Sequence, residues 1–451
     1  KNDTIIFKGE DNLHYEKFQD GTIKCIEDEI PFEVPEGWAW ARLRDICMMS
    51  AGKSKSTDQI KSEPFEESYP CFGGNGVRGY VDEYNQDGIF SIVGRQGALC
   101  GNINIAIGKF YATEHAVVTT LFDGIDFKWS NYILEALRLN NYATGAAQPG
   151  LSVANILNVF VPVPPTQEQD RIGNNVYESL KIVEALEQEK IDLQKIIITA
   201  KTKILDLAIR GKLVPQDPND EPASVLLERI RTEKEELIKQ GKIKRDKKES
   251  VIFKGDDNSY YLRTGRVEES LEDWRFDDLP ETWKICCLGE LCDYGDCINV
   301  NTEDIAEDAW ILDLEDIEKD TGTVLKKVTK DQRNSVSTKH KFHSGQVLYS
   351  KLRPYLNKVV LSDADGYCTS EILPLEFKNC VLPEYARYYL MSGTFIAYAN
   401  HCSYGVKMPR LGTTDGKKAI FSLPPLSEQK RIVETIDFCF VQLNKISEAL
   451  A

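Results

Sequence analysis

The sequence predicts an α+β protein in which two mixed α/β domains form a pseudo-twofold internal repeat, joined by long helices with coiled-coil periodicity. The segment Val161–Ile172, VPVPPTQEQDRI, recurs as FSLPPLSEQKRI at Phe421–Ile432. The segment Ile5–Tyr15, IIFKGEDNLHY, recurs as VIFKGDDNSYY at Val251–Tyr261. Apolar residues at helical spacing follow both copies of the first segment. Because self-similarity of this kind indicates a repeated architecture, the chain is interpreted as an internal duplication.

Each half of the chain contains a central region, here called the body, whose sequence differs between the halves. Similar short segments, here called the borders, stand at both ends of each body. VPEGW at Val34–Trp38 and LPETW at Leu279–Trp283 open the two bodies, and the Pro-Pro segments close them. Inside the bodies the sequences are only weakly similar. GIFSIVGRQG in the first body aligns with GQVLYSKLRP in the second, and YATEH aligns with YCTSE. Similar borders around different centres predict one scaffold that presents two different surfaces.

A long helix is expected at residues 166–210, directly after the first Pro-Pro pair. Thr166 is the expected N-cap, with Glu168 in the first turn and Gln169 three residues after the cap. Arg210 followed by Gly211 is a stop signal. At 1.5 Å per residue such a helix is about 65 Å long, which is typical of a spacer. Its apolar stripe needs a partner helix and consists of Ile172, Val176, Leu180, Val183, Leu186, Leu193, Ile197, Ala200, Ile204 and Leu207.

A second helix of the same kind is expected from residue 426 to 451, capped by Ser427 or a neighbour, with Ile432, Ile436 and Leu443 in its stripe. Between the two repeats, residues 211–250 form a turn-rich connector and a short charged helix, Val225–Gln240. The basic run at residues 241–248 is either a solvated linker or a phosphate contact. The expected domains are therefore residues 1–165, 166–210, 211–250, 251–425 and 426–451.

The repeat also predicts more chain than the present sequence contains. Lys1 aligns with Lys247, inside a repeat unit, and the second helix reaches Ala451 without a stop signal. We expect the natural chain to be longer at both ends, or at least upstream, with an upstream segment that resembles KILDLAIRGKLVPQDPNDEPASVLLERI.

Composition favours a soluble cytoplasmic protein. No apolar run approaches the roughly 18–20 residues of a membrane span, and no signal-peptide pattern opens the chain. The cysteines are scattered among apolar neighbours, which suits a reducing cytosol. The net charge of −16 argues against a generic nucleic-acid binder, although it says little about a single local surface.

Motifs that carry catalysis or bind metal are not found in the sequence. FGGNG at Phe72–Gly76 resembles a glycine-rich cofactor loop but lacks the helix pattern that should follow it. No P-loop is present. His340 and His343 have no third ligand cluster, and Cys292 and Cys297 have no second pair at zinc-ribbon spacing. The sequence therefore predicts a non-catalytic chain without a metal site.

Both bodies contain loops in which glycine, basic, amide and aromatic residues cluster. Arg and Lys neutralise phosphates or pair with guanine, Asn and Gln pair with adenine, and Glu accepts from cytosine. Two different loop-rich bodies on rigid helices predict a reader of two separated DNA half-sites. The candidate contacts are Asn75, Arg78, Tyr80, Arg95, Gln96, Lys109, Tyr111, Thr113, His115 and Gln148 in the first body, and Lys351, Arg353, Tyr355, Lys358, Ser370, Glu371, Lys407 and Arg410 in the second.

The duplicated PP-x-x-EQ-x-RI, the PEGW border and the connector LAIRGKLVPQDPNDEPASVLLERI resemble the specificity subunit of type I restriction–modification systems, over essentially the whole chain. The resemblance implies that each body is a target recognition domain that reads one half of a split site in double-stranded DNA. It also implies that the long helices pack antiparallel as a spacer. The first body has VGRQGALCGN at Val93–Asn102 where the second has YSKLRPYLNK at Tyr349–Lys358, so the two half-sites are expected to differ in sequence.

The resemblance further implies partners and cofactors. Two methyltransferase subunits would dock on the helices and recruit restriction subunits, and S-adenosylmethionine, ATP and magnesium would belong to those partners. The expected docking residues are Ile172, Val176, Leu180, Leu193, Ile197, Ile204, Ile432, Ile436 and Leu443. Two alternatives remain open at this point: the specificity part of a fused restriction–methylation enzyme, and a protein-interaction scaffold with two binding modules.

Overall fold

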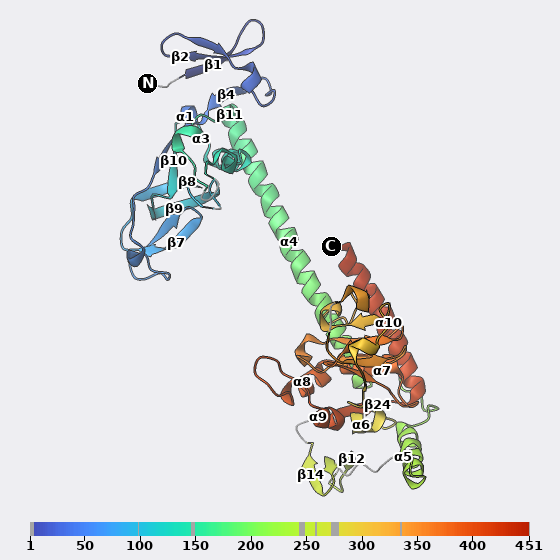
Figure 1. Ribbon diagram of the computed structural model, residues 1–451. Helices are drawn as coiled ribbons and strands as arrows, with labels where there is room; N and C mark the ends of the chain where they lie inside the picture. The colour runs from blue at the N-terminus through green and yellow to red at the C-terminus, as the bar shows by residue number, and fades with distance from the viewer. Residues whose placement is uncertain are drawn as a thin grey trace. The chain divides into compact units, whose positions relative to one another are not determined.

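The computed structural model describes residues 4–97, 99–145, 149–242, 249–257, 259–271, 279–333 and 336–450. Its contacts divide the chain into two units, Lys1–Gln188 and Glu189–Ala451, with the boundary inside helix α4. Both units contain strands and helices (Figure 1). The prediction of two repeated domains with mixed α/β content is confirmed.

In the first unit a six-stranded sheet, ordered β5-β10-β8-β9-β6-β7, carries the body. Helix α2 packs on it through Trp129 and Leu134, which are buried together with Val93 and Val117 of the sheet. The elements are β1 Thr4–Lys8, β2 His14–Phe18, β3 Ile23–Cys25, β4 Ala39–Arg42, α1 Leu43–Ile46, β5 Cys47–Ala51, β6 Tyr69–Gly73, β7 Gly76–Val81, β8 Gln86–Gly94, β9 Ile103–Ala112, β10 Ala116–Leu121, α2 Phe127–Ala136, α3 Val153–Ile156, β11 Phe160–Val163 and α4 Thr166–Ile209.

In the second unit two sheets, ordered β16-β19-β22-β17-β18 and β21-β20-β23, carry the body. Helices α7 and α8 close one core with Tyr385, Tyr389 and Phe395. The elements are α5 Ala223–Lys239, β12 Ser250–Lys254, β13 Tyr260–Thr264, β14 Val267–Ser270, β15 Lys284–Cys287, α6 Leu288–Leu291, β16 Ile298–Val300, β17 Trp310–Leu312, β18 Val328–Thr329, β19 Lys339–Phe342, β20 Val347–Ser350, β21 Val359–Leu361, β22 Gly366–Thr369, β23 Ile372–Leu375, α7 Pro383–Leu390, α8 Gly393–His401, α9 Thr413–Lys418, β24 Ile420–Leu423 and α10 Leu426–Ala449.

The borders of the two bodies fold alike. The repeated IFKG-DN sequence forms the hairpin β1–β2 in one unit and β12–β13 in the other. In each hairpin a tyrosine hydroxyl donates to the turn aspartate, Tyr15 to Asp11 and Tyr261 to Asp257. The strand after each border tryptophan pairs antiparallel with the strand before each Pro-Pro, β4 with β11 and β15 with β24. The start and the end of each body therefore lie side by side.

Helix α4 confirms the long helix expected after the first Pro-Pro pair. It ends in a Schellman motif, because Lys212 N–H donates to Leu207 O at 2.9 Å and Gly211 has φ +66°. The expected N-caps are wrong. Thr166 and the residue before Ser427 are already helical, and the backbone carbonyls of Pro165 and Pro425 accept the first helical N–H bonds.

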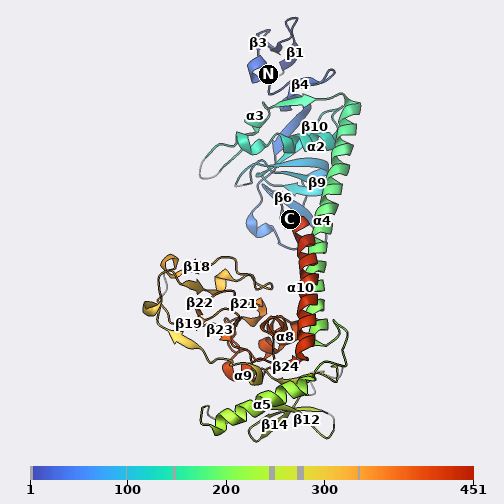
Figure 2. The same ribbon diagram turned by 90° about the vertical axis from the view of Figure 1, so that its right-hand side faces the viewer.

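Within the second unit, α10 packs beside the last part of α4, as both views of the ribbon show (Figure 2). Lys201 Nζ donates to Asn444 Oδ1 at 2.6 Å, whereas Leu205 and Ile209 share a core with Ile432 and Ile436. Residue numbers rise along one helix as they fall along the other, so this contact is antiparallel. Among the residues that the structure describes, no helix is both long and apolar enough to span a membrane.

Candidate nucleic-acid interface

Three loops of the first body meet at the end of strand β8. Arg95 N–H donates to His115 O at 2.9 Å, and Leu151 N–H donates to Arg95 O at 2.8 Å. An antiparallel bridge also joins Gln96 to Gly150. The backbone of Arg95 therefore joins the loop between β9 and β10 to the loop before α3. The side chain of Arg95 is partly buried.

The same three-way junction forms in the second body at the end of strand β20. Lys351 N–H donates to Glu371 O at 3.0 Å, and Leu411 N–H donates to Lys351 O at 3.0 Å. An antiparallel bridge joins Leu352 to Arg410. Each backbone contact of the first body has its counterpart here.

The strands that feed these junctions are also matched. Gly94 pairs with Ala116 between β8 and β10, and Ser350 pairs with Ile372 between β20 and β23. The alignment of GRQG with SKLRP and of YATEH with YCTSE is thus confirmed as a shared backbone frame. Different side chains stand on this frame: Arg95, Gln96 and His115 in one body, and Lys351, Leu352 and Glu371 in the other.

A hollow of about 650 Å³ opens beside the junction of the first body. Four candidate residues line it: Asn75, Arg78, Gln96 and His115. Asn75 is held by Asn102, whose Nδ2 donates to its Oδ1 at 3.0 Å, and Arg78 Nη2 donates to Thr57 Oγ1 at 3.0 Å. Donors, acceptors and a cation thus converge on one hollow, which suits recognition of a base edge or phosphate.

Glycines make this hollow possible. A Cβ on Gly94 would lie 2.0 Å from the carbonyl oxygen of Gly74, and a Cβ on Gly74 would lie 3.0 Å from Gln96 O. The FGGNG turn therefore has a packing role: it lets two backbones approach closely.

Other candidates of the first body lie elsewhere. Thr113 is fully buried and donates to Phe72 O at 2.9 Å, and Tyr111 is 5% exposed with its hydroxyl directed to Ser54 O. We assign both to the scaffold, because they cannot reach a macromolecule. Lys109 stacks on Tyr84 near the opposite end of the β8–β9 hairpin from Arg95, since its strand partner is Asp87. Tyr80 pairs its backbone with Lys61, and Gln148 lies outside the described residues.

In the second body two candidates pair with each other. Arg410 donates from Nε and Nη2 to the carboxylate of Glu371, at 2.9–3.1 Å. These hydrogen bonds to the Glu371 carboxylate raise the pKa of Arg410. The pair is partly exposed, so it presents a fixed acceptor and a fixed donor at the junction rather than two independent charges.

Arg353 stands on a strained turn next to that pair. Its φ is +50°, in the left-handed region that few non-glycine residues adopt, and its N–H donates to Pro409 O at 2.7 Å. Its Nε is buried and has no hydrogen-bond partner among the described residues. Such strain at a loop is typical of functional sites.

The remaining candidates of the second body divide into exposed and internal residues. Tyr355, Ser370 and Lys407 are exposed. Lys358 instead donates to Leu314 O at 2.7 Å, and burial lowers its pKa, which indicates a role within the fold.

The segment Asp313–Asp316 was not among the candidates from the sequence, yet it occupies the place of the FGGNG turn in the second body. The parallel pairing of β17 with β22 matches that of β6 with β9, which sets this equivalence. Arg333 pairs with Asp313 and with the fully buried Asp316 there. An ion-paired cluster thus replaces the glycine hollow, and only the matched strand pairing could have revealed it.

The expected docking residues of the helices differ in how far they are buried. Ile432, Ile436 and Ile197 are buried, and Ile204 packs partly buried against the same core as Ile432. Leu180 is 44% and Leu193 37% exposed, whereas Ile172, Val176 and Leu443 are partly buried. Further apolar residues are exposed on α4 and α10, namely Ile182, Val183, Leu186, Ile191, Ile196, Ile198, Phe438, Val441 and Ile446.

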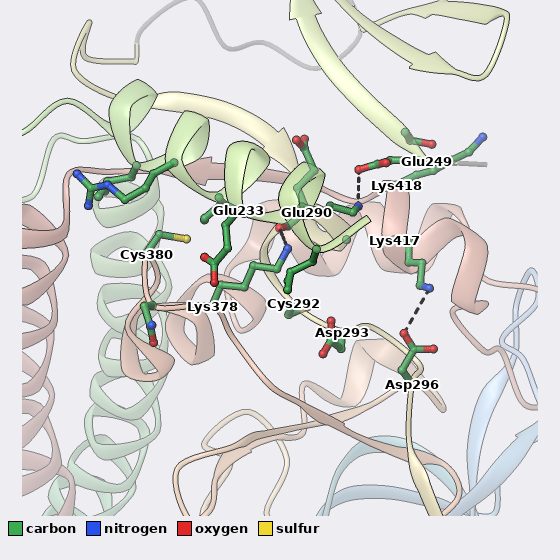
Figure 3. Close-up of a pocket in the computed structure, with 18 of the residues that line it drawn as sticks. Glu233, Glu249, Glu290, Cys292, Asp293, Asp296, Lys378, Cys380, Lys417 and Lys418 are labelled. Atoms are coloured by element: carbon green, nitrogen blue, oxygen red, sulfur yellow. Dashed lines mark hydrogen bonds and ion pairs between the residues drawn. The ribbon is translucent and has the colours of Figure 1, made fainter. Parts of the chain in front are cut away.

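A cavity of about 1090 Å³ in the second unit lies between α5, the β12–β13 hairpin, α6 and α9 (Figure 3). Two ion pairs lie in its lining, Lys234 with Glu249 at 2.6 Å and Lys417 with Asp296 at 3.8 Å, and Lys378 Nζ donates to the backbone carbonyl of Glu290 at 2.7 Å. It shares no lining residue with the three-loop junction, so it is not part of the candidate interface.

The chain is similar to known specificity subunits. It is 25% identical over 500 aligned residues to the type I restriction enzyme EcoAI specificity subunit of Escherichia coli, covering 93% of this chain and 80% of that one. It is 47% identical over 152 residues to the EcoprrI specificity subunit of E. coli, which is 33% of this chain and 36% of that relative. The fold matches the HsdS subunit from Thermoanaerobacter tengcongensis with a TM-score of 0.51 at 15% identity, over 93% of both chains.

A second solved structure, reported for complex assembly and conformational transition of the type I R-M system, matches with a TM-score of 0.53 at 15% identity, over 93% of this chain and 94% of that one. The family model described as Type I restriction modification DNA specificity domain matches the chain twice, at residues 35–200 and 280–449. Each match begins at a border tryptophan segment and runs through a body into a long helix. The chain therefore belongs to the family of type I restriction–modification DNA specificity domains.

Proposed function

We propose that this chain is the non-catalytic subunit that gives a type I restriction–modification complex its DNA sequence specificity. The observation that carries the proposal is the three-loop junction, which occurs twice with one backbone frame and two sets of side chains. A frame used twice with different side chains is suited to read two different sequences. The DNA site is accordingly bipartite and asymmetric, with one half read by each body.

The side chains at the junctions fit this role. Donors for base edges and phosphates are present at both junctions. They are Arg95, Gln96 and the hollow at Arg78 in the first body, and Lys351, Arg353 and Lys407 in the second. The net charge of −16 is therefore compatible with DNA binding, because contact with DNA needs only local basic groups.

The helices would hold the assembly together. The antiparallel contact between α4 and α10 supports their use as a coiled-coil spacer, and their exposed apolar residues, such as Leu180 and Leu193, would dock two methyltransferase subunits. Restriction subunits would join through those subunits. S-adenosylmethionine, ATP and magnesium would be bound by the partners, so methylation and cleavage would take place on other chains.

Methylation mapping of a host genome that expresses this chain with its methyltransferase is the direct test. We expect one bipartite motif with two dissimilar halves. Binding of the purified complex to that motif should weaken as salt rises, because phosphate contacts release counterions. Methylation without a two-part motif, or no sequence-selective DNA binding by the complex, would refute the proposal.

Replacing Arg353 should impair one half-site. Arg353→Ala is expected to weaken binding by about 1–3 kcal/mol and to relax the sequence preference of the half read by the second body, because a guanidinium contact is lost. Arg353→Gly is the matched control, since glycine tolerates the φ of +50° that strains alanine. Equal loss in both variants assigns the effect to the guanidinium. Loss of subunit assembly, or recovery with glycine, would assign it to the backbone.

A further inference from the structure

One surface of the second repeat is covered by residues 205–227, which comprise the end of α4, the connector and the start of α5. Leu205, Ile209 and Leu226 share a core with Trp283 and Ile432. The covering segment also packs tightly against the border segment Leu279–Trp283. A Cβ on Gly211 would lie only 2.5 Å from Pro280 Cγ. The border tryptophan and the start of the helix after the Pro-Pro pair thus form one apolar docking face.

Polar contacts fix the connector on this face. Glu428 accepts from Trp283 Nε1 at 2.9 Å and from the side-chain amide of Gln216. Arg431 Nη2 donates to Asp220 Oδ2 at 2.6 Å. The Glu and the Arg of the repeated PP-x-x-EQ-x-RI therefore each hold one residue of the connector.

The first repeat carries the same face without a cover. Among the described residues, Trp38 Nε1 is buried and has no hydrogen-bond partner, although its counterpart Trp283 has one. Among the described residues, the side chains of Glu168 and Arg171, the counterparts of Glu428 and Arg431, have no hydrogen-bond or ion-pair partner. Five matched pairs differ in the same way, because the second residue is buried and the first is partly or fully exposed: Trp38 and Trp283, Pro165 and Pro425, Glu168 and Glu428, Ile172 and Ile432, Val176 and Ile436.

Residues 205–227 cannot cover both faces. Ala208, Ala223 and Leu227 are at most 4% exposed in the core of the second repeat. Moving the segment to the first repeat would expose this core. The vacant face therefore needs a second segment of the same kind.

We propose that the face formed by Trp38, Pro165, Glu168, Ile172 and Val176, with Arg171 at its edge, docks a second segment of the sequence pattern L-x-x-A-I-R-G-K-L-V-P-Q-D-P-N-D. An apolar helix end would cover Ile172 and Val176. The glutamine of the pattern would bind Glu168, which would then turn to accept from Trp38 Nε1, and the second aspartate after it would bind Arg171. This docking is independent of DNA reading and would fix the orientation of the first repeat's helix.

A synthetic peptide of residues 203–231 tests the proposal against the full 451-residue chain. Isothermal titration calorimetry should show one peptide bound per chain. Arg171→Ala in the chain and Asp220→Ala in the peptide should each weaken binding about tenfold, and together they should weaken it no further, because both remove one ion pair. Arg171 is exposed, so its replacement leaves the fold intact.

Arg431→Ala in the chain is the matched control and should leave the affinity of the peptide unchanged. If Arg431→Ala alters that affinity as much as Arg171→Ala does, the peptide is exchanging into the second repeat and the proposal fails. It also fails if a monomeric chain does not bind the peptide, or if sedimentation shows a dimer in which two chains exchange their own segments. None of these outcomes bears on DNA recognition.

Discussion

Exchanging residues 35–160 for the corresponding body of another specificity subunit is expected to change one half of the recognised DNA site and to leave the other half unchanged. The physical reason is that the junction at Arg95 and the hollow at Arg78 both lie inside the exchanged segment. Each base pair that no longer matches costs about 1–3 kcal/mol, so several mismatches abolish specific binding to the original site.

The structure indicates why such an exchange should fold. The segment begins four residues before β4 and ends at the first residue of β11, and these two strands pair, with Ala39 opposite Val163 and Arg42 opposite Phe160. A body can therefore be replaced between two neighbouring strands while the helix that follows keeps its start. The same pairing joins Lys284 to Leu423 in the second unit.

Methylation mapping before and after the exchange measures the outcome. The matched control is an exchange of residues 280–420, which should change the other half of the motif only. A motif that changes in both halves after either single exchange would show that the two bodies do not read separately. An unchanged motif would place base recognition outside the bodies.

Elements that depend on nearby residues could be predicted from the sequence. The end of α4 follows from Arg210 and Gly211, whose left-handed φ completes the Schellman motif. The shared frame of the two bodies could also be predicted, because GRQG and SKLRP stand at the same distance from the matching YATEH and YCTSE segments.

Contacts between distant residues could not be predicted. Glu371 and Arg410 are separate candidates in the sequence, yet they form one ion pair. Thr113 has the composition of a contact residue but is buried behind Phe72. Gln169 matches a capping box, but its amide bonds to Asp126, 43 residues earlier in the chain. Each of these contacts depends on tertiary packing between residues far apart in the chain, which a local sequence pattern does not predict.

The glutamine of the repeated PP-x-x-EQ-x-RI is expected to have the largest effect on stability. Gln429 is fully buried, and its amide accepts from Leu382 N–H at 2.8 Å while donating to Cys380 O at 2.9 Å and Pro424 O at 3.0 Å. It thereby fixes the start of α10 to the start of α7. In the first unit Gln169 makes the matching bonds to Asp126 N–H and Pro164 O.

Gln429→Leu should lower the free energy of unfolding of the second unit by about 3–5 kcal/mol, because it preserves volume but leaves three buried backbone groups unpaired. Gln169→Leu leaves only two such groups, so a smaller loss, about 2–4 kcal/mol, is expected in the first unit. Urea denaturation followed by circular dichroism measures both losses, with the exposed Gln442→Leu on α10 as the control. If Gln429→Leu unfolds at the same urea concentration as Gln442→Leu, the glutamine does not anchor the helix. If it unfolds early, the repeated motif stabilises the point where each body meets its helix, and this explains why the chain contains it twice.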